Sequence, residues 1–461
     1  MELLNFLVEV VKTPALILGF VALIGLALQR KNGAQIFAGT VKTALGMIVL
    51  TAGAGLIVAA ISPFVTLFQE VTGLAGFATG SELISAAMQK SIPVIASTSA
   101  VILAAGFVVN AILARFTPLK YIFLTGHMMW IASVMIAYSL YSAGLNEMWT
   151  MILGSVIQGG LLTLLPAIAQ PIMRKVIGSD DFALGHLTTL GTVPSAYIGG
   201  LVGNKSKSTE DIKVPKGLAF FKDTAVSISV VMLVFYLAIV IAAGPERTGE
   251  LSGGTNYILF GLLQALGFAA GMLVLLQGVR MFLGELVPAF KGISDKLVPN
   301  AKPALDVPAI FMFAPNALMI GFVTAVAGML VGMVASSLAF GVVPLVSIIG
   351  AFFTGGVSGI MGNATGGRRG AVVSGFVYGF ILIFLSGLTY MLFDHFSAVG
   401  AEGTGHDTID SMLTMLAFQT PWVGMVILVA AFVLMSLLEV RRTRRLKKAA
   451  EADVATSESR N

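Results

Sequence analysis

The sequence predicts an all-α integral membrane protein with about eleven transmembrane helices, two inverted repeats and some re-entrant or broken segments. Of its 461 residues, 57% are hydrophobic and only 11% are charged, whereas about a quarter of the residues of soluble domains carry charge. The mean hydropathy is +0.93. Such a chain suits a bilayer, where each helical span needs about 20 apolar residues. The composition therefore excludes a soluble enzyme or a soluble binding module.

Apolar stretches separated by charged or Gly/Pro-rich breaks define the candidate spans. Glu2 and Glu9 precede the first stretch in place of the basic start of a signal peptide, so we expect that stretch to be a retained span. We expect a membrane domain over residues 1–440 and a basic tail over 441–461 that is disordered beyond its start. The predicted spans lie near residues 13–30, 43–67, 93–114, 121–142, 148–172, 223–244, 256–280, 316–338, 340–361, 371–393 and 420–440.

The basic residues test this span assignment. An odd number of spans places the two termini on opposite sides, and a cytoplasmic C-terminus then brings all but three of the 28 basic residues inside. The three exceptions are Lys12, Lys90 and Arg247. Positive charge collects on the cytoplasmic side of membrane proteins. We therefore expect an outside N-terminus and a cytoplasmic C-terminus. Because the basic residues form short patches between spans, they do not indicate nucleic-acid binding.

An internal repeat divides the predicted membrane domain. The sequence Gly-Met-Ile-Val-Leu at 46–50 recurs as Gly-Met-Leu-Val-Leu at 271–275, 225 positions later, and Pro63 meets Pro288 at the same offset. The matched spans are the second and the seventh, so they run in opposite directions. The halves would cover roughly 13–222 and 223–440. Inverted repeats are typical of alternating-access carriers, whose substrate site lies where the halves meet. Chance similarity between Gly-rich apolar helices is the alternative.

Three polar residues stand in apolar surroundings, where an ionisable side chain is costly unless it is paired or functional. His127 lies in the fourth predicted span, where its imidazole could bond a polyhydroxylated ligand while Trp130 stacks on a sugar face. A helix-packing histidine is the alternative. Asp306 lies between Pro303 and Pro308, in a segment too rich in proline for a regular helix. Its alternative role is to cap the next helix.

His186 is the third of these residues, and it lies in the long segment 176–222. The stretch 182–203 is apolar and Gly-rich enough to dip back into the protein, which irregular backbone can do only where protein or a wet cavity surrounds it. An ordinary cytoplasmic loop is the alternative. His395 and His406 fall in the predicted outward segment 394–418, whose spacing matches no metal motif, so we expect a solvated loop there.

The chain lacks cysteine, which excludes disulfides, thiolate metal sites and a phosphocysteine carried on this chain. The sequence also offers no nucleophile–base pair and no set of metal ligands. We therefore predict no catalytic residue, no cofactor and no metal.

Several motifs resemble the ascorbate-type enzyme IIC components of the bacterial phosphotransferase system. The resemblance covers nearly the whole chain apart from the tail. It rests on the segment QGVRMFLGELVPAFKGIS at 277–294, Leu305-Asp306, FAPNA at 313–317, TGHMM at 125–129, Gly185-His186 and KTALG at 42–46.

This resemblance implies a permease of the bacterial inner (plasma) membrane. Members are homodimers in membrane lipid, and each protomer interleaves its repeats into a scaffold and a mobile core. A separate IIB protein, recharged by IIA, carries the phosphocysteine and phosphorylates the sugar. The substrate-binding positions of the family fall on His127, Met128, Met129, Trp130, Ile131, His186, Leu187, Asp306, Ser81 and Glu82.

The chain departs from the family pattern at three of these positions. Ile131 and Leu187 stand where ascorbate-binding members have Gln, and Glu82 stands where they have an aromatic hydroxyl. An unpaired polar group of a ligand costs about 1–3 kcal/mol. The expected substrate is therefore ascorbate or a related small sugar or sugar acid. An ion-coupled secondary transporter, with His127 or Asp306 as its proton site, is the alternative function.

Overall fold

The computed structural model describes residues 14–72, 76–212, 224–296, 298–399 and 404–458, and most of them are helical. Among these residues, seven helices are long and apolar enough to cross a membrane. This confirms the prediction of a multi-pass helical membrane protein. The seven segments are Pro93–Phe116, Glu147–Ile177, Met232–Ser252, Tyr257–Val274, Pro315–Phe340, Ala351–Leu392 and Pro421–Leu446.

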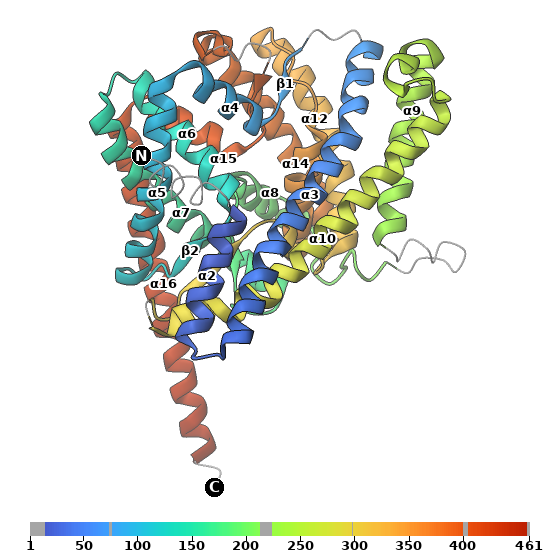
Figure 1. Ribbon diagram of the computed structural model, residues 1–461. Helices are drawn as coiled ribbons and strands as arrows, with labels where there is room; N and C mark the ends of the chain where they lie inside the picture. The colour runs from blue at the N-terminus through green and yellow to red at the C-terminus, as the bar shows by residue number, and fades with distance from the viewer. Residues whose placement is uncertain (1–13, 73–75, 213–223, 297, 400–403, 459–461) are drawn as a thin grey trace.

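The helices follow one another with short breaks (Figure 1). In chain order the α-helices are α2 (Pro14–Leu28), α3 (Gly33–Thr72), α4 (Ser81–Ser91), α5 (Pro93–Phe116), α6 (Gly126–Ser142), α7 (Glu147–Ile177), α8 (Thr189–Val202), α9 (Thr224–Ser252), α10 (Tyr257–Lys296), α11 (Pro308–Phe311), α12 (Pro315–Phe340), α13 (Ile348–Gly350), α14 (Gly356–Leu392), α15 (Ile409–Phe418) and α16 (Pro421–Glu458). A π-helical turn, η2 (Ala351–Gly355), joins α13 to α14, and a 3₁₀ segment, η3 (Asp394–Val399), follows α14.

Within the described residues, five short strands interrupt the helices, and the all-α prediction did not include them. They are β1 (Ala78–Thr79), β2 (Tyr121–Phe123), β3 (Ala183–Leu184), β4 (Lys302–Leu305) and β5 (Thr404–Gly405). The fourth predicted span is consequently divided, because its first residues pair as β2 and only the remainder forms α6. Extended backbone can lie inside a membrane protein only if its polar groups are paired. The strands supply that pairing.

The strands form two parallel sheets. The first has the order β2-β4-β3, with Tyr121 opposite Lys302 and Leu184 opposite Leu305. In the second sheet β1 pairs with β5, and Phe77 forms a further parallel bridge with Pro344. Each sheet therefore joins segments that lie far apart in the sequence.

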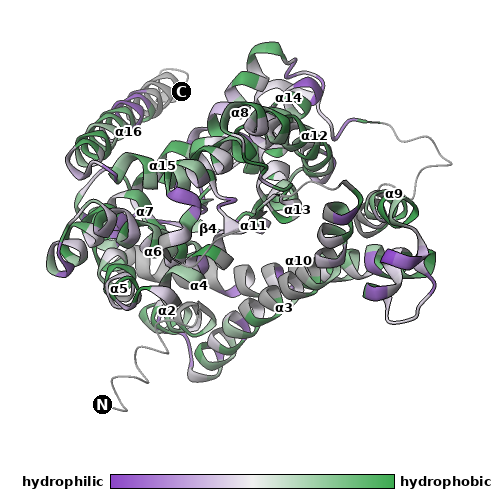
Figure 2. Cartoon of the chain, turned by 90° about the horizontal axis from the view of Figure 1, so that it is seen from above, coloured by the Kyte–Doolittle hydropathy of each residue, from purple (hydrophilic) through white to green (hydrophobic). Residues whose placement is uncertain are grey.

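The long helices pack in two groups. Helices α2, α3, α9 and α10 pack on one another, and α3 and α10 run side by side along one flank of the molecule (Figure 2). The second group contains α5, α6 and α7, together with α8, α12 and α14. Close approach of backbones fixes α12 on α14, since a Cβ on Gly328 would lie 2.0 Å from the carbonyl oxygen of Phe376. The first sheet contacts α5 and α7, and α10 through β4, and the second sheet contacts α4 and α14.

The basic tail differs from the expected disordered segment. Helix α16 continues without a break from Pro421 to Glu458 and projects beyond the other helices at its C-terminal end (Figure 1). Its last turns contain no glycine or proline to stop the helix, and alanine, lysine and arginine favour helical conformation.

Candidate functional site

Three of the predicted polar residues follow the carboxyl ends of the first sheet. His127 comes four residues after β2, His186 two residues after β3, and Asp306 directly after β4. The carboxyl ends of parallel strands meet at the same edge of a sheet, which is where many α/β proteins place their ligand. The pairing β2-β4-β3 therefore brings together three side chains from distant parts of the chain.

The carboxylate of Asp306 lies between the two imidazoles. Its Oδ2 atom is 3.9 Å from Nε2 of His127, and its Oδ1 atom is 3.9 Å from Nε2 of His186. The two rings are 6.4 Å apart between centroids and lie edge to face. Both nitrogen–oxygen distances are too long for direct hydrogen bonds. These three residues, the His-His-Asp triad, thus keep hydrogen-bonding capacity for another molecule.

Burial differs across the triad. The side chain of His127 is 33% exposed, that of Asp306 is 12% exposed and that of His186 is 5% exposed. The backbone N–H of Val307 donates to Asp306 Oδ1 at 2.7 Å, which orients the carboxylate. Nδ1 of His186 is buried and has no hydrogen-bond partner among the described residues. A buried polar atom without a partner is unusual and points to a missing ligand or water.

Two local features hold the strands in register. Asn110 on α5 brackets β2, because its Nδ2 donates to Tyr121 O at 3.0 Å and its Oδ1 accepts from Phe123 N at 3.0 Å. Gly185 lets β3 approach β4, since a Cβ at this position would lie 2.5 Å from the carbonyl oxygen of Ala304. The position of His186 therefore depends on the residue before it having no side chain.

The apolar positions carried over from the family lie beside the triad in sequence. Met128, Met129 and Ile131 are buried in α6, Leu187 is buried next to His186, and Trp130 is partly buried. All of them belong to or pack against the hydrophobic cluster around α6. Ile131 and Leu187 offer no hydrogen bond, so the polar contacts described for the triad come from its imidazoles and carboxylate.

Ser81 lies in a different polar cluster, at the carboxyl end of the second sheet. Its backbone N–H donates to Asp407 Oδ1 at 2.8 Å, and its Oγ lies 2.9 Å from Oγ1 of Thr408. Ser347 donates to the other carboxylate oxygen of Asp407 at 3.0 Å. We call Ser81, Ser347, Asp407 and Thr408 the companion cluster. Glu82 lies in α4, and its side chain is outside the described part of the structure.

Asp410 lies two residues after Thr408 of the companion cluster and contacts the start of α8. Its carboxylate accepts from the backbone N–H groups of Thr189 at 2.9 Å and Leu190 at 2.8 Å, at the first turn of α8. A carboxylate is well suited to this position because the N-terminal N–H groups of a helix lack internal partners. Asp410 thereby fixes the start of α8, three residues after His186.

The expectation of a solvated loop over 394–418 was wrong for its second half. His406 is fully buried against Phe396, and Asp407 and Asp410 are also buried. His395 is exposed. The charged residues suggested solvent, but helix α15 and strand β5 return the chain to the interior. A signal was present: Gly185-His186 recurs as Gly405-His406, and both pairs follow or end a short strand.

The triad offers two imidazole nitrogens and a carboxylate oxygen, all within 4.8 Å of one another. A divalent cation can use such donors. The same groups can also bind the hydroxyls of a sugar, because a carboxylate accepts and a neutral imidazole both donates and accepts. The prediction of no metal stays a prediction.

These features define a helical multi-pass membrane protein with a polar site built on interrupted helices. The family model described as "PTS system sugar-specific permease component" (EIIC-GAT) matches residues 9–420. The chain therefore belongs to this permease family, which confirms the resemblance seen in the sequence. It is also similar to the "Ascorbate-specific PTS system EIIC component" of Mycoplasma pneumoniae (strain ATCC 29342 / M129 / Subtype 1). The identity is 29% over 436 residues, covering 82% of this chain and 64% of that relative, so the chain spans just under two thirds of the relative's length.

Proposed function

We propose that this chain is the permease (enzyme IIC) of a phosphotransferase system and that it binds and translocates ascorbate or a related small sugar or sugar acid. Membership of the permease family and the similarity to an ascorbate-specific relative support this function. A separate IIB protein, supplied with phosphate by IIA, would phosphorylate the bound solute. The absence of cysteine agrees with this division, since the chain carries no thiol to hold a phosphoryl group.

The His-His-Asp triad is the observation that carries the proposal. Two imidazoles and a carboxylate face one another without direct hydrogen bonds, amid the apolar residues of a membrane protein. Such groups are costly unless they serve a ligand or an ion pathway. A solute with several hydroxyls can bond all three, which repays the cost of burying them.

The first test is uptake by variants of the triad. Loss of a hydrogen bond to a charged group costs about 1.5–3 kcal/mol, or roughly 10- to 150-fold in affinity. We expect His127→Ala and Asp306→Asn to lower uptake at least about tenfold while their membrane insertion stays normal. Lys205→Ala, in an exposed loop away from the site, is the control. Normal uptake by both triad variants would remove these residues from the site.

The coupling mechanism needs a separate experiment. A permease of a phosphotransferase system should deliver phosphorylated solute, and its uptake should stop when the general phosphotransferase proteins are deleted. An ion-coupled carrier would survive that deletion and stop with an uncoupler. Uptake that persists without the phosphotransferase proteins would contradict the proposal.

Substrate identity depends on the two apolar positions beside the triad. Ile131 and Leu187 cannot bond a solute hydroxyl, so the native site should favour a ligand with fewer polar groups at that place than ascorbate presents. Thermal-shift measurements with ascorbate, pentoses and polyols would identify the ligand, because only a ligand of the folded protein stabilises it. The variant Ile131→Gln/Leu187→Gln should shift the preference toward ascorbate. Met128, Met129, Trp130, Ser81 and Glu82 are the further proposed contacts.

The two sheets support the proposed inverted repeats. Tyr121 pairs with Lys302 in the first sheet, and Pro344 pairs with Phe77 in the second. Tyr121 corresponds to Pro344 in this comparison, and Lys302 corresponds to Phe77. Both correspondences lie close to 225 positions apart, which is the offset of the sequence repeat. In the first sheet the central strand β4 comes from the half near 223–440, and its neighbours β2 and β3 come from the half near 13–222. In the second sheet β1 comes from the first half, whereas its partner β5 and the bridging Pro344 come from the second. Eleven spans would follow if the shorter helices and the two parts of α14 also cross the membrane.

The helix groups support the proposed division into scaffold and core. Helices α2, α3, α9 and α10 come from both halves and pack together, as expected of a scaffold. The helices around the triad would form the moving core within residues 1–440. We propose that two scaffolds meet in a homodimer surrounded by lipid, which cross-linking of cysteine pairs introduced on these helices would test.

Contacts between loops support the proposed orientation. Lys302 and Arg442 meet at Asp180, and Arg368 donates to the carbonyl of Ser208, all within segments assigned to the cytoplasm. Arg247, assigned to the outside, contacts the carbonyl of Glu70. The N-terminus would then lie outside and the tail 441–461 in the cytoplasm of a bacterial cell. Labelling of cysteines introduced near the ends of the chain would test this.

A further inference from the structure

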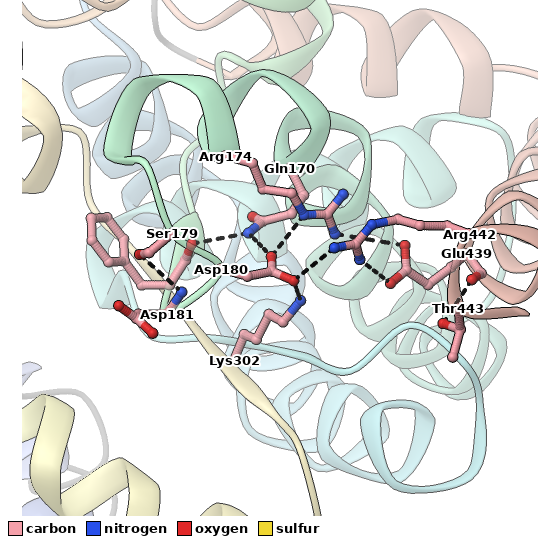
Figure 3. A network of polar contacts seen from close by, with 10 residues as sticks. Gln170, Arg174, Ser179, Asp180, Asp181, Lys302, Glu439, Arg442 and Thr443 are labelled. Carbon is pink, nitrogen blue, oxygen red and sulfur yellow. Dashed lines mark hydrogen bonds and ion pairs between the residues drawn. The ribbon is translucent and has the colours of Figure 1, made fainter. Parts of the chain in front are cut away.

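A charged cluster lies below the first sheet, where the segment before β3, the start of β4 and helix α16 meet (Figure 3). Asp180 is its centre. Its Oδ1 accepts from Gln170 at 2.7 Å and from Arg174 at 2.8 Å, while its Oδ2 is 2.6 Å from Nζ of Lys302 and 3.1 Å from Nη2 of Arg442. These contacts join α16 to β4 and to the segment before β3. Asp306 directly follows β4, and His186 follows β3.

The cluster has more positive than negative charge. Asp180 and Glu439 are already paired with Arg174, Lys302 and Arg442. Two further cations stand beside them, Lys120 and Arg444, and no carboxylate in the described ranges lies within ion-pair distance of either.

Lys120 lies partly buried beside a further cation, Arg115. The ammonium group donates to the carbonyl of Arg115 at 2.8 Å. Burial, together with the positive charge of Arg115, lowers the pKa of Lys120 below its usual value. A nearby anion would raise the pKa of Lys120 again, because an opposite charge favours the protonated form.

These residues surround a cavity of about 490 Å³. Ligand pockets in proteins are commonly about 300–1,000 Å³, so the cavity has room for a small anionic group. Its lining consists of Pro118, Lys120, Tyr121, Asp180, Asn300, Lys302, Glu439, Val440, Arg442, Thr443, Arg444 and Leu446.

The cavity lies at the end of the most exposed span of the described chain. Only 11% of the Pro421–Leu446 span is buried inside the molecule, compared with 72% of Glu147–Ile177. Leu434, Leu437 and Leu438 are exposed along its side, and Leu446, also exposed, lines the cavity. Figure 2 shows α16 at the edge of the helix assembly. An apolar surface thus leads to Lys120 and Arg444, the two cavity cations that have no carboxylate partner among the described residues.

We propose that this cavity binds the phosphate headgroup of an anionic phospholipid, with the acyl chains lying along α16. The phosphate pairs with Lys120 and Arg444, while Arg442 and Lys302 remain with Asp180. Basic pockets at the ends of membrane helices bind such headgroups. A soluble phosphate would use the cations alone, whereas a phospholipid also covers the exposed leucines of α16. The lipid therefore accounts for both features.

The test compares lipids on the purified full chain. Phosphatidylglycerol added to detergent-solubilised protein should raise its melting temperature by at least about 2 °C more than phosphatidylcholine does. Native mass spectrometry should show retained phosphatidylglycerol. The variant Lys120→Ala/Arg444→Ala should lose at least half of both signals. Lys205→Ala/Lys207→Ala is the matched control, because it removes two exposed positive charges away from the cavity.

Three results would overturn the proposal. The first is an equal response to the two lipids, or an unchanged response in the cavity variant. The second is equal stabilisation by inorganic phosphate or glycerol phosphate at the same concentration, which would make the cavity a site for a soluble anion. The third is a cavity variant that keeps its lipid response but whose bound solute is no longer phosphorylated by IIB, which would make this surface a docking site for a protein.

Discussion

The two small sheets use the same backbone arrangement but present their polar groups differently. At the first sheet, the nitrogen–oxygen distances between Asp306 and the two histidines are both 3.9 Å. At the second, Ser81, Asp407 and their neighbours are joined by hydrogen bonds of 2.8–3.1 Å. The triad keeps hydrogen-bonding capacity for another molecule, whereas the companion cluster is joined internally. Both ring nitrogens of the adjacent His406 are nevertheless buried without a hydrogen-bond partner among the described residues. The same pairing of short parallel strands can therefore hold polar side chains either apart or joined by hydrogen bonds.

The largest expected difference between the sheets concerns their glycines. A Cβ on Gly185 would lie 2.5 Å from a backbone carbonyl oxygen, whereas a Cβ on Gly405 would lie 2.4 Å from the ring of Phe77. The backbone of Ala304 cannot shift as easily as the side chain of Phe77 can rotate. We expect Gly185→Ala to cost about 3 kcal/mol and Gly405→Ala about 1 kcal/mol. Thermal unfolding in detergent measures both. Equal losses would show that the two sheets are equally rigid.

The second comparison separates stability from binding. Asp407→Leu leaves the N–H of Ser81 and the hydroxyl of Ser347 without an acceptor, so it should lower stability by about 1–3 kcal/mol. His186→Leu removes a nitrogen that has no partner and should leave the melting temperature nearly unchanged, but it should abolish solute binding. Solute titration and thermal unfolding of both variants provide the measurements. If Asp407→Leu abolished solute binding and His186→Leu lowered stability, the second sheet would be the binding site and the first would be structural.

We expect low pH to destabilise the contacts of the first sheet by protonating Asp180. Burial alone would raise the pKa of this carboxyl, but hydrogen bonds from Lys302, Arg174 and Gln170 outweigh it and hold the pKa well below the usual value of 3.8. A carboxyl with a depressed pKa stabilises the folded state fully above its unfolded pKa, and this stability is lost as the pH falls toward the folded pKa. Asp180→Asn should cost about 1 kcal/mol at pH 7, after allowance for solvent screening, and less than half of that at pH 2. A deficit that does not shrink in acid would show that the charge is not responsible.

The smallest effect provides a baseline outside both sheets. Lys42 pairs with Glu285 at 3.1 Å between α3 and α10, with side chains that are 60% and 29% exposed. Exposed ion pairs contribute about 0.2–1 kcal/mol. Lys42→Ala should therefore change the free energy of unfolding by about 0.5 kcal/mol and leave solute binding intact. A loss as large as that of Asp407→Leu would give this pair a role in the assembly of the transporter.

The sequence predicted the helices well where charge and proline mark their ends. Helices α5, α7, α12 and α16 begin within one residue of the expected spans, because Pro or Asn stands at or just before each start. It also identified His127, His186 and Asp306 as functional candidates, since ionisable groups in apolar surroundings are costly.

The strands and the companion cluster could not be predicted in the same way. A strand of two to four residues shows no alternation of polar and apolar side chains, and its pairing depends on a partner more than a hundred residues away. The segment of His406 carried enough charge to indicate solvent, although its carboxylates are consumed by buried backbone N–H groups. The repeated Gly-His pair was the available signal.

The position of β4 between β2 and β3 has a consequence for how the molecule forms. While the N-terminal half is being synthesised, β2 and β3 have no partner in their sheet, because the strand that joins them is encoded more than a hundred residues further on. Unpaired edges in a bilayer leave polar backbone exposed to hydrocarbon. The segments that form β2 and β3 must therefore stay unpaired, or be shielded by other proteins, until translation passes residue 305. Only then can the chain close around its interior.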